Sequence, residues 1–241
     1  MARRLRLFIP NIPCHIIQRG NNKTPIFLEM KDYQYFLEVL QEAKLKHPCQ
    51  LYGYCLMPNH FHLIINPQPT GNVSLFMKLV GGKYVRYFNK KYGRTGTLWE
   101  NRFRSFLIGG EHYFIRCLRY VETNPVRAGL VKLPESYQWS SYNFRALGVN
   151  NPILDLDPWF SGLSATITEC RQIYTQFITE SIKERELIQL RKITQHGGIF
   201  ANGKFKAHIE KCYQGRTIIK HPGRPKKCLI STNKIGPTPI I

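Results

Sequence analysis

The sequence predicts an α+β fold: a four-stranded antiparallel sheet with helices, followed by a helical, basic C-terminal extension. Short apolar and β-branched runs indicate strands at residues 14–18, 50–56, 60–65 and 104–108. Helical spacing of apolar residues indicates helices at 30–46, 74–92 and 111–123. The order βαββαβα is typical of a ferredoxin-like split βαβ arrangement, and its last helix is free to lie over the sheet.

The second and third predicted strands are separated by Pro58-Asn59, two residues that favour turns. His60 and His62 open the third strand. Because side chains alternate along a strand, both imidazoles lie on one face of the sheet and Phe61 points to the other. Two imidazoles in this arrangement can chelate a divalent metal ion. A half-buried, hydrogen-bonded pair of histidines would give the same pattern.

The last predicted helix begins near Glu111, and Pro125 ends it. Tyr120 and Asn124 lie four residues apart, so they share one helix face. A phenol can act as a nucleophile, and an amide oxygen can complete a metal site begun by two histidines. Taken alone, the pair also fits a partly buried tyrosine and an asparagine that caps the helix.

Several motifs follow one another through the first 145 residues or so, and they are more specific together than singly. They occupy residues 16–22, 57–64 (MPNHFHLI), 96–103, 119–131 and 139–142 (WSSY). With these motifs the sequence resembles the single-tyrosine HUH endonucleases, specifically the REP-associated tyrosine transposases related to small insertion-sequence transposases. The resemblance assigns the nucleophile to Tyr120 and the metal ligands to His60, His62 and Asn124.

The resemblance implies that the chain cleaves and rejoins DNA through a 5′-phosphotyrosine intermediate with a divalent metal ion. An amide ligand favours Mg²⁺ or Mn²⁺, although two imidazoles would also suit zinc or copper. The expected partner is single-stranded or hairpin DNA with palindromic repeats, bound by a monomer or a homodimer. Two alternatives stay open: a non-catalytic protein that binds single-stranded nucleic acid, and a metal-dependent phosphodiesterase that uses water.

The charge of the chain agrees with a nucleic-acid partner. It has 35 Lys and Arg against 15 Asp and Glu, a formal net charge of +20, and such an excess attracts polyanions. An anionic membrane surface would also be attracted, but aromatic residues interleaved with the basic ones suit bases and phosphates better. The candidate DNA-binding residues are Arg19, Trp99, Arg102, Arg116, Arg119 and Arg127.

The sequence further predicts three segments: a catalytic domain at 1–147, a helical extension at 148–219 and a flexible basic tail at 220–241. The tail contains Gly-Arg-Pro-Lys, which resembles a minor-groove insert, but a single copy favours a non-specific basic arm. No stretch of eighteen apolar residues occurs, so we expect no membrane span and a cytoplasmic location, associated with the nucleoid. Seven cysteines without C-x-x-C spacing argue against disulfides and zinc knuckles.

Overall fold

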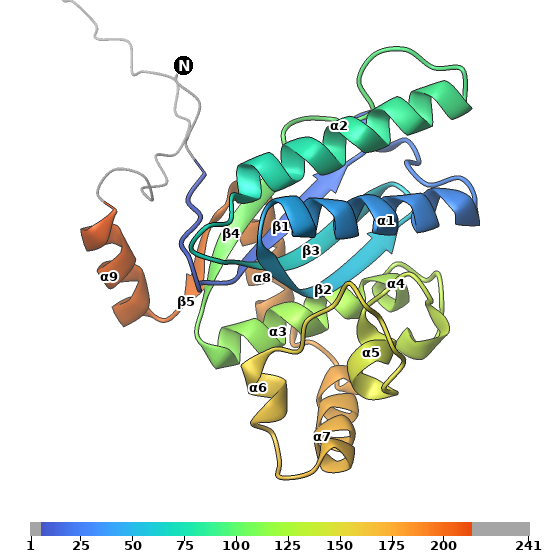
Figure 1. Ribbon diagram of the computed structural model, residues 1–241. Helices are drawn as coiled ribbons and strands as arrows, with labels where there is room; N and C mark the ends of the chain where they lie inside the picture. Colours follow the sequence, from blue (N-terminus) through green and yellow to red (C-terminus); the bar gives the residue numbers. More distant parts are fainter. Residues whose placement is uncertain (1–5, 214–241) are drawn as a thin grey trace, which may run out of the picture.

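The computed structural model describes residues 6–213 (Figure 1). Its strands are β1 (Cys14–Arg19), β2 (Cys49–Met57), β3 (His60–Pro67), β4 (Arg104–Gly109) and β5 (Gly198–Ala201). Its longer helices are α1 (Met30–Lys46), α2 (Val73–Lys91), α3 (Glu111–Glu122), α7 (Ile167–Thr179), α8 (Glu184–His196) and α9 (Gly203–Cys212). Short helices are α4 (Asn124–Arg127), α5 (Tyr142–Ala146) and α6 (Pro158–Ser161), with 3-10 turns η1 (Asn21–Lys23) and η2 (Pro134–Ser136).

The sheet has five strands in the order β2-β3-β1-β4-β5. Strands β1 to β4 pair antiparallel, whereas β5 runs parallel to β4, with Leu107 opposite Ile199. The seven elements predicted in the first 123 residues are all present, each within two residues of its predicted ends. The prediction of four strands in a purely antiparallel sheet is wrong, because the C-terminal segment returns to the sheet and adds a strand at its edge.

Helices cover both faces of the sheet (Figure 1). Helices α1 and α2 pack on one face, where Phe36, Phe61 and Tyr84 belong to one apolar core. Helix α3 crosses the opposite face, where Phe114 and Ile64 belong to a second core. Since Phe61 enters the first core, its neighbours His60 and His62 turn to the face that α3 crosses, as strand alternation predicts.

The Pro58-Asn59 turn, which precedes the two histidines, is held by hydrogen bonds from the first motif, residues 16–22, and from the segment after it. The backbone N–H of Gly20 donates to Asn59 O (2.8 Å), and that of Ile26 donates to Pro58 O (2.7 Å). A side chain at Gly20 would not fit, because a Cβ there would lie 2.2 Å from Thr24 O. The motif at residues 96–103 joins the same assembly, where Gly20 forms a β-bridge with Trp99. The motifs therefore meet in space around the Pro58-Asn59 turn.

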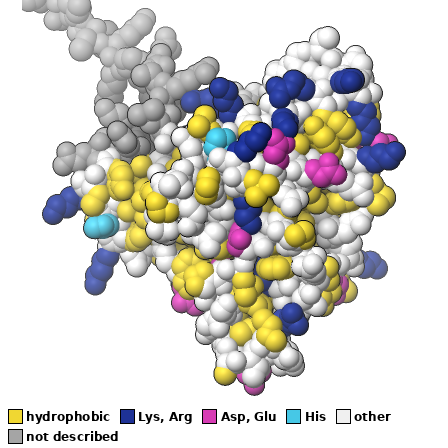
Figure 2. All heavy atoms as spheres, in the orientation of Figure 1, with side chains coloured by type: hydrophobic (Ala, Val, Ile, Leu, Met, Phe, Trp, Pro, Cys, Tyr) yellow, Lys and Arg dark blue, Asp and Glu magenta, His cyan; other side chains and the backbone are white. Residues whose placement is uncertain are grey.

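Residues beyond 147 form α6 to α9 and β5, and α8 packs against α3 and β4. This segment is helical as predicted, apart from β5. The division of the chain into three segments stays a prediction, and the predicted tail at 220–241 lies outside the described residues. Among helices of residues 6–213, none combines the length and the apolar composition that a membrane span requires. Basic side chains are spread over the face seen in Figure 2, with fewer acidic ones among them.

Candidate active site

The structure brings together the two histidines and the asparagine that the sequence proposes as metal ligands. The amide nitrogen of Asn124 lies 2.7 Å from His62 Nε2 and 3.5 Å from His60 Nε2. His60 and His62 come from the start of β3, and Asn124 is the first residue of α4. One ring nitrogen of each histidine and one terminal amide therefore converge from two separate elements.

Each histidine is also held from behind through its other ring nitrogen. His60 Nδ1 lies 2.6 Å from Asn59 Oδ1, and His62 Nδ1 lies 2.8 Å from His15 Nε2. His15 is fully buried on β1 and stacks on Phe106 with 4.7 Å between ring centroids. The two imidazoles thus have fixed orientations, and both present Nε2 to Asn124.

Tyr120 lies beside this group, within the same chain. Its ring meets the His62 ring edge-on, with 5.9 Å between centroids, and only 8% of the residue is exposed. The guanidinium of Arg127 lies 4.5 Å from the centre of the tyrosine ring. Arg127 also donates to Tyr120 O (2.7 Å) and to Thr123 Oγ1 (2.6 Å). Arg127 therefore ties α4, which begins at Asn124, to the end of α3, which carries Tyr120.

Burial sets the protonation of the site. It lowers the pKa of His60 to about 4, with a contribution from the charge of Arg19. It lowers the pKa of His62 well below the usual range and that of His15 to about 3. These imidazoles are therefore neutral at physiological pH, as metal ligands must be. Burial raises the pKa of the Tyr120 phenol, and the positive charge of Arg127 opposes that rise.

Two of the four predicted residues line a cleft of about 590 Å³, which we call the site cleft. Tyr120 and His60 line it directly. Its other polar lining residues are Gln18, Arg19, Asn59, Glu100, Asn101, Arg102, Arg104, Arg191, Thr194, Gln195 and His196. Four of these are arginines and one is a glutamate, so the cleft favours an anion. The end of α8 supplies the last four residues, so the extension forms one wall of the site.

A larger groove of about 930 Å³, which we call the side groove, continues from the site cleft. Asn101, Arg102 and Arg104 line both cavities. Arg6, Lys78 and Trp99 line the side groove but not the site cleft. The two cavities together form a basic path along the sheet, with an aromatic side chain on one wall.

The candidate DNA-binding residues fall into two groups and one single residue, Arg127, which lies over the Tyr120 ring. Arg102 and Trp99 line the cavities, and so does Arg19, although it pairs with Glu100 at 2.6 Å. Arg116 and Arg119 do not line either cavity, and both pair with Glu186 of α8, at 2.9 and 3.2 Å. These two arginines hold α8 against α3. Binding of DNA by any of the six residues stays a prediction.

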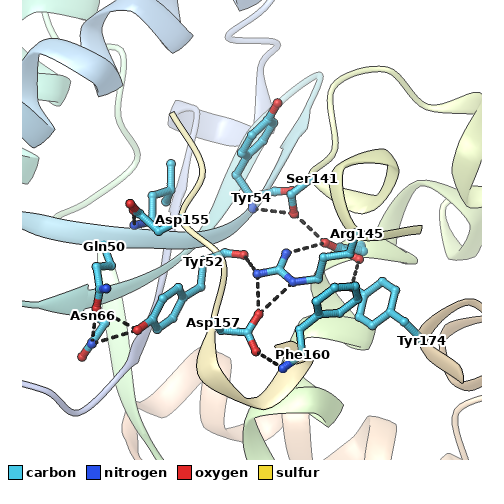
Figure 3. A network of polar contacts seen from close by, with 12 residues as sticks. Gln50, Tyr52, Tyr54, Asn66, Ser141, Arg145, Asp155, Asp157, Phe160 and Tyr174 are labelled. Carbon is cyan, nitrogen blue, oxygen red and sulfur yellow. Dashed lines mark hydrogen bonds and ion pairs between the residues drawn. The ribbon is translucent and has the colours of Figure 1, made fainter. Parts of the chain in front are cut away.

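A buried polar network supports the end of α3 from the other side (Figure 3). Ser141 Oγ donates to Glu122 Oε1 (2.6 Å), and Tyr174 donates to the second oxygen of Glu122. Arg145 is fully buried, with Nη2 2.7 Å from Asp157 Oδ2 and Nη1 3.8 Å from Glu122 Oε1. Ser141 belongs to the WSSY motif, so this motif positions α3 by contacting Glu122, two residues after Tyr120.

The donor set fits a divalent cation. The nitrogen and oxygen of a terminal amide exchange places by rotation, so Asn124 can present its oxygen where His60 and His62 present Nε2. Within residues 6–213, no three or more His, Cys, Asp or Glu side chains form a cluster suited to a metal. Two nitrogens and one amide oxygen beside an arginine-lined cleft suit an ion that shares its coordination sphere with a bound phosphate.

Sequence reasoning missed two parts of the site. His15 stands only two residues before Ile17, the partner of His62 in the sheet, but one histidine in an apolar strand carries no signal of its own. The wall formed by Arg191 and Thr194 depends on how α8 docks, which is a long-range contact. In both cases the missing information was which segments lie side by side.

Comparisons with known proteins relate this chain to transposases. Residues 9–124 match the family model described as "Transposase IS200 like". A curated Haemophilus influenzae protein, named provisionally as a REP-associated tyrosine transposase, is 26% identical over 136 residues, which is 49% of this chain and 77% of that protein. A solved REP-associated tyrosine transposase bound to a REP hairpin superposes with a TM-score of 0.53 at 19% identity, covering 65% of this chain and 93% of that one.

The solved structure supports the likeness of fold, while the family model spans both the histidine motif and Asn124. The curated relative adds a sequence match of its own. Residues 9–124 therefore match the IS200-like transposases, and the chain is similar in sequence and in fold to REP-associated tyrosine transposases.

Proposed function

We propose that this protein cleaves and rejoins single-stranded or hairpin DNA, with Tyr120 as the nucleophile. The observation that supports the proposal most directly is the contact of His60 and His62 with Asn124 next to Tyr120, whose ring lines an arginine-lined cleft. A divalent ion, Mg²⁺ or Mn²⁺, held by the two histidines and Asn124, would polarise the scissile phosphate.

The reaction conserves the phosphodiester bond. The Tyr120 oxygen forms a bond to phosphorus while the bond from phosphorus to the 3′ oxygen breaks, and the 3′ oxygen gains a proton. The products are a 5′-phosphotyrosine linkage and a free 3′-OH. Attack by another 3′-OH reverses the step and returns Tyr120 to its phenol form, so rejoining needs no external energy. Arg127 stabilises the developing negative charge beside the tyrosine ring.

The substrate proposal rests on the two cavities. An extended strand can run from the side groove into the site cleft, past Arg102 and Arg104, and a base can stack on Trp99. A solved structure of similar fold holds a REP hairpin, and we extend that partner to this chain: a palindromic hairpin with a single-stranded flank. Tyr120 lies beside the histidines of its own chain, which supports cleavage by one protomer acting alone.

The test is a denaturing gel of the protein incubated with a labelled DNA hairpin and Mn²⁺. We expect a labelled covalent band that disappears when EDTA is added before the DNA. Cleavage without a covalent band would indicate a phosphodiesterase that uses water. Binding without cleavage would indicate a non-catalytic DNA-binding protein. Equal cleavage in EDTA and in Mn²⁺ would refute the metal site.

A further inference from the structure

Behind the proposed metal ligands lies a histidine that no sequence motif singled out. His15 is fully buried between the ring of Phe106 and the ring of His62, and its Nε2 lies 2.8 Å from His62 Nδ1. Its other nitrogen, Nδ1, is buried and has no hydrogen-bond partner among the described residues. A phenylalanine would fill the same space without burying an unpartnered polar atom, so packing alone does not explain a histidine here.

The hydrogen bonds around His62 determine where the protons lie. His62 Nε2 faces Asn124 at 2.7 Å and is the nitrogen that would bind the metal ion, so in the metal-binding tautomer it carries a lone pair. A neutral imidazole that accepts at Nε2 carries its proton on Nδ1. That proton is donated to His15 Nε2, which leaves the proton of His15 on the unpartnered Nδ1.

His60 has the same arrangement with a different partner. Its Nδ1 lies 2.6 Å from Asn59 Oδ1, an acceptor, so its Nε2 is also left with a lone pair facing Asn124. Both histidines are thus held in the tautomer that can bind a metal ion through Nε2. The two supports differ in exposure, because His15 is fully buried whereas Asn59 is partly exposed at the turn.

We propose that His15 is a positioning residue that holds His62 in its metal-binding tautomer and orientation. The inference rests on the metal site of the proposed function, which it deepens. His15 does not touch the metal or the DNA; it acts by accepting the Nδ1 proton of His62. In this role His15 accepts at Nε2 and carries its own proton on Nδ1, for which no described residue provides an acceptor.

The experiment compares three variants with the full-length protein. His15→Phe keeps a ring on Phe106 but removes the acceptor, His15→Gln places an amide oxygen near the position of Nε2, and Asn59→Ala removes the exposed support of His60. Mn²⁺ affinity is measured by titration without DNA, and the histidine tautomers are measured by long-range ¹H–¹⁵N NMR. Thermal unfolding of each variant verifies that it is folded.

We expect His15→Phe to weaken Mn²⁺ binding by about 10- to 100-fold, the usual effect of losing an outer-shell partner. His15→Gln should recover most of that loss, and Asn59→Ala should lose less than His15→Phe, because water can replace Asn59. In the wild type, NMR should place the His62 proton on Nδ1. Unchanged Mn²⁺ affinity in folded His15→Phe, or a wild-type His62 proton on Nε2, would overturn the proposal.

These measurements distinguish a failure of the proposed metal site from a failure of the positioning role of His15. Absence of Mn²⁺ binding by the wild-type protein would refute the metal site itself, and with it the proposed chemistry. The tautomer of His62 is read in the metal-free protein, so it tests the hydrogen bond to His15 whatever the metal result. A wild type that binds Mn²⁺ as tightly as the folded His15→Phe variant would refute the positioning role and leave the metal site in place.

Discussion

Replacement of Tyr120 by phenylalanine removes the proposed nucleophile and little else. The ring contacts with His62 at 5.9 Å and with Arg127 at 4.5 Å do not require the hydroxyl group. Loss of one neutral hydroxyl at the edge of a cleft changes the free energy of unfolding by no more than about 1 kcal/mol. Loss of an attacking atom, by contrast, lowers the rate by at least about 10⁴-fold. Stability and catalysis should therefore separate cleanly in this variant.

The assay combines hairpin binding, the covalent band on a denaturing gel and urea unfolding. Tyr113→Phe is the matched control, because Tyr113 lies two helical turns earlier on α3 and packs edge-on against Phe200, at 4.9 Å, rather than lining the site cleft. We expect Tyr120→Phe to bind hairpin DNA and unfold like the wild type but to form no covalent band. Tyr113→Phe should form the band.

Either of two results would refute this reasoning. A covalent band in Tyr120→Phe would assign the nucleophile to another residue, and Tyr113 would be the first to test. Cleavage at the wild-type rate without a band would show that water attacks the phosphate. Loss of hairpin binding together with lower stability would show instead that the hydroxyl has a structural role that these contacts do not reveal.

Three further predictions concern the surroundings of Tyr120. His62→Ala should reduce Mn²⁺-dependent cleavage far more than Asn124→Ala, because water can replace an amide oxygen; equal losses in a Mn²⁺ titration would contradict this. Arg145→Met should lower the free energy of unfolding by about 3–5 kcal/mol, since it leaves buried carboxylates unpaired; an unchanged urea midpoint would count against it. The pKa values of about 3 for His15 and about 4 for His60 lie below the unfolded value near 6.5, so the unfolded chain binds more protons in acid. Stability should therefore be complete above pH 6.5 and fall from there toward pH 4 in urea unfolding, and a flat profile would refute the burial of these imidazoles.

Local patterns in the sequence were sufficient for most of the fold. Alternation placed His60 and His62 on one face, because this periodicity follows from backbone geometry alone. Helical spacing predicted one helix for Tyr120 and Asn124, whereas α3 ends at Glu122 and Asn124 begins α4. Strand β5 was missed for a physical reason. Its four residues, Gly198–Ala201, lie between two helices and are too few to show alternation. They form a strand only because β4 offers an unpaired edge.

Charge was the weakest guide to the site. Arg102 and Arg119 look alike in sequence, yet Arg102 lines both cavities whereas Arg119 is buried against Glu186. What distinguishes them is the docking of α8, and no local pattern predicts a contact between residues 67 positions apart. An excess of basic residues therefore indicates a polyanionic partner for the whole chain without showing which arginines meet it.

The position of the nucleophile depends on residues beyond the family segment at 9–124. Helix α3 is held on one side by Glu122, which contacts Ser141 and Tyr174, and on another by Arg119, which pairs with Glu186. Tyr120 lies between these two anchors, one residue from Arg119 and two from Glu122. An unpaired buried charge is strongly unfavourable. The side chains of Arg119 and Glu122 are therefore stable in their buried positions only when the later segments supply their partners. The extension is thus better understood as a support for α3 and a wall of the site cleft than as a separate accessory to an independent catalytic domain.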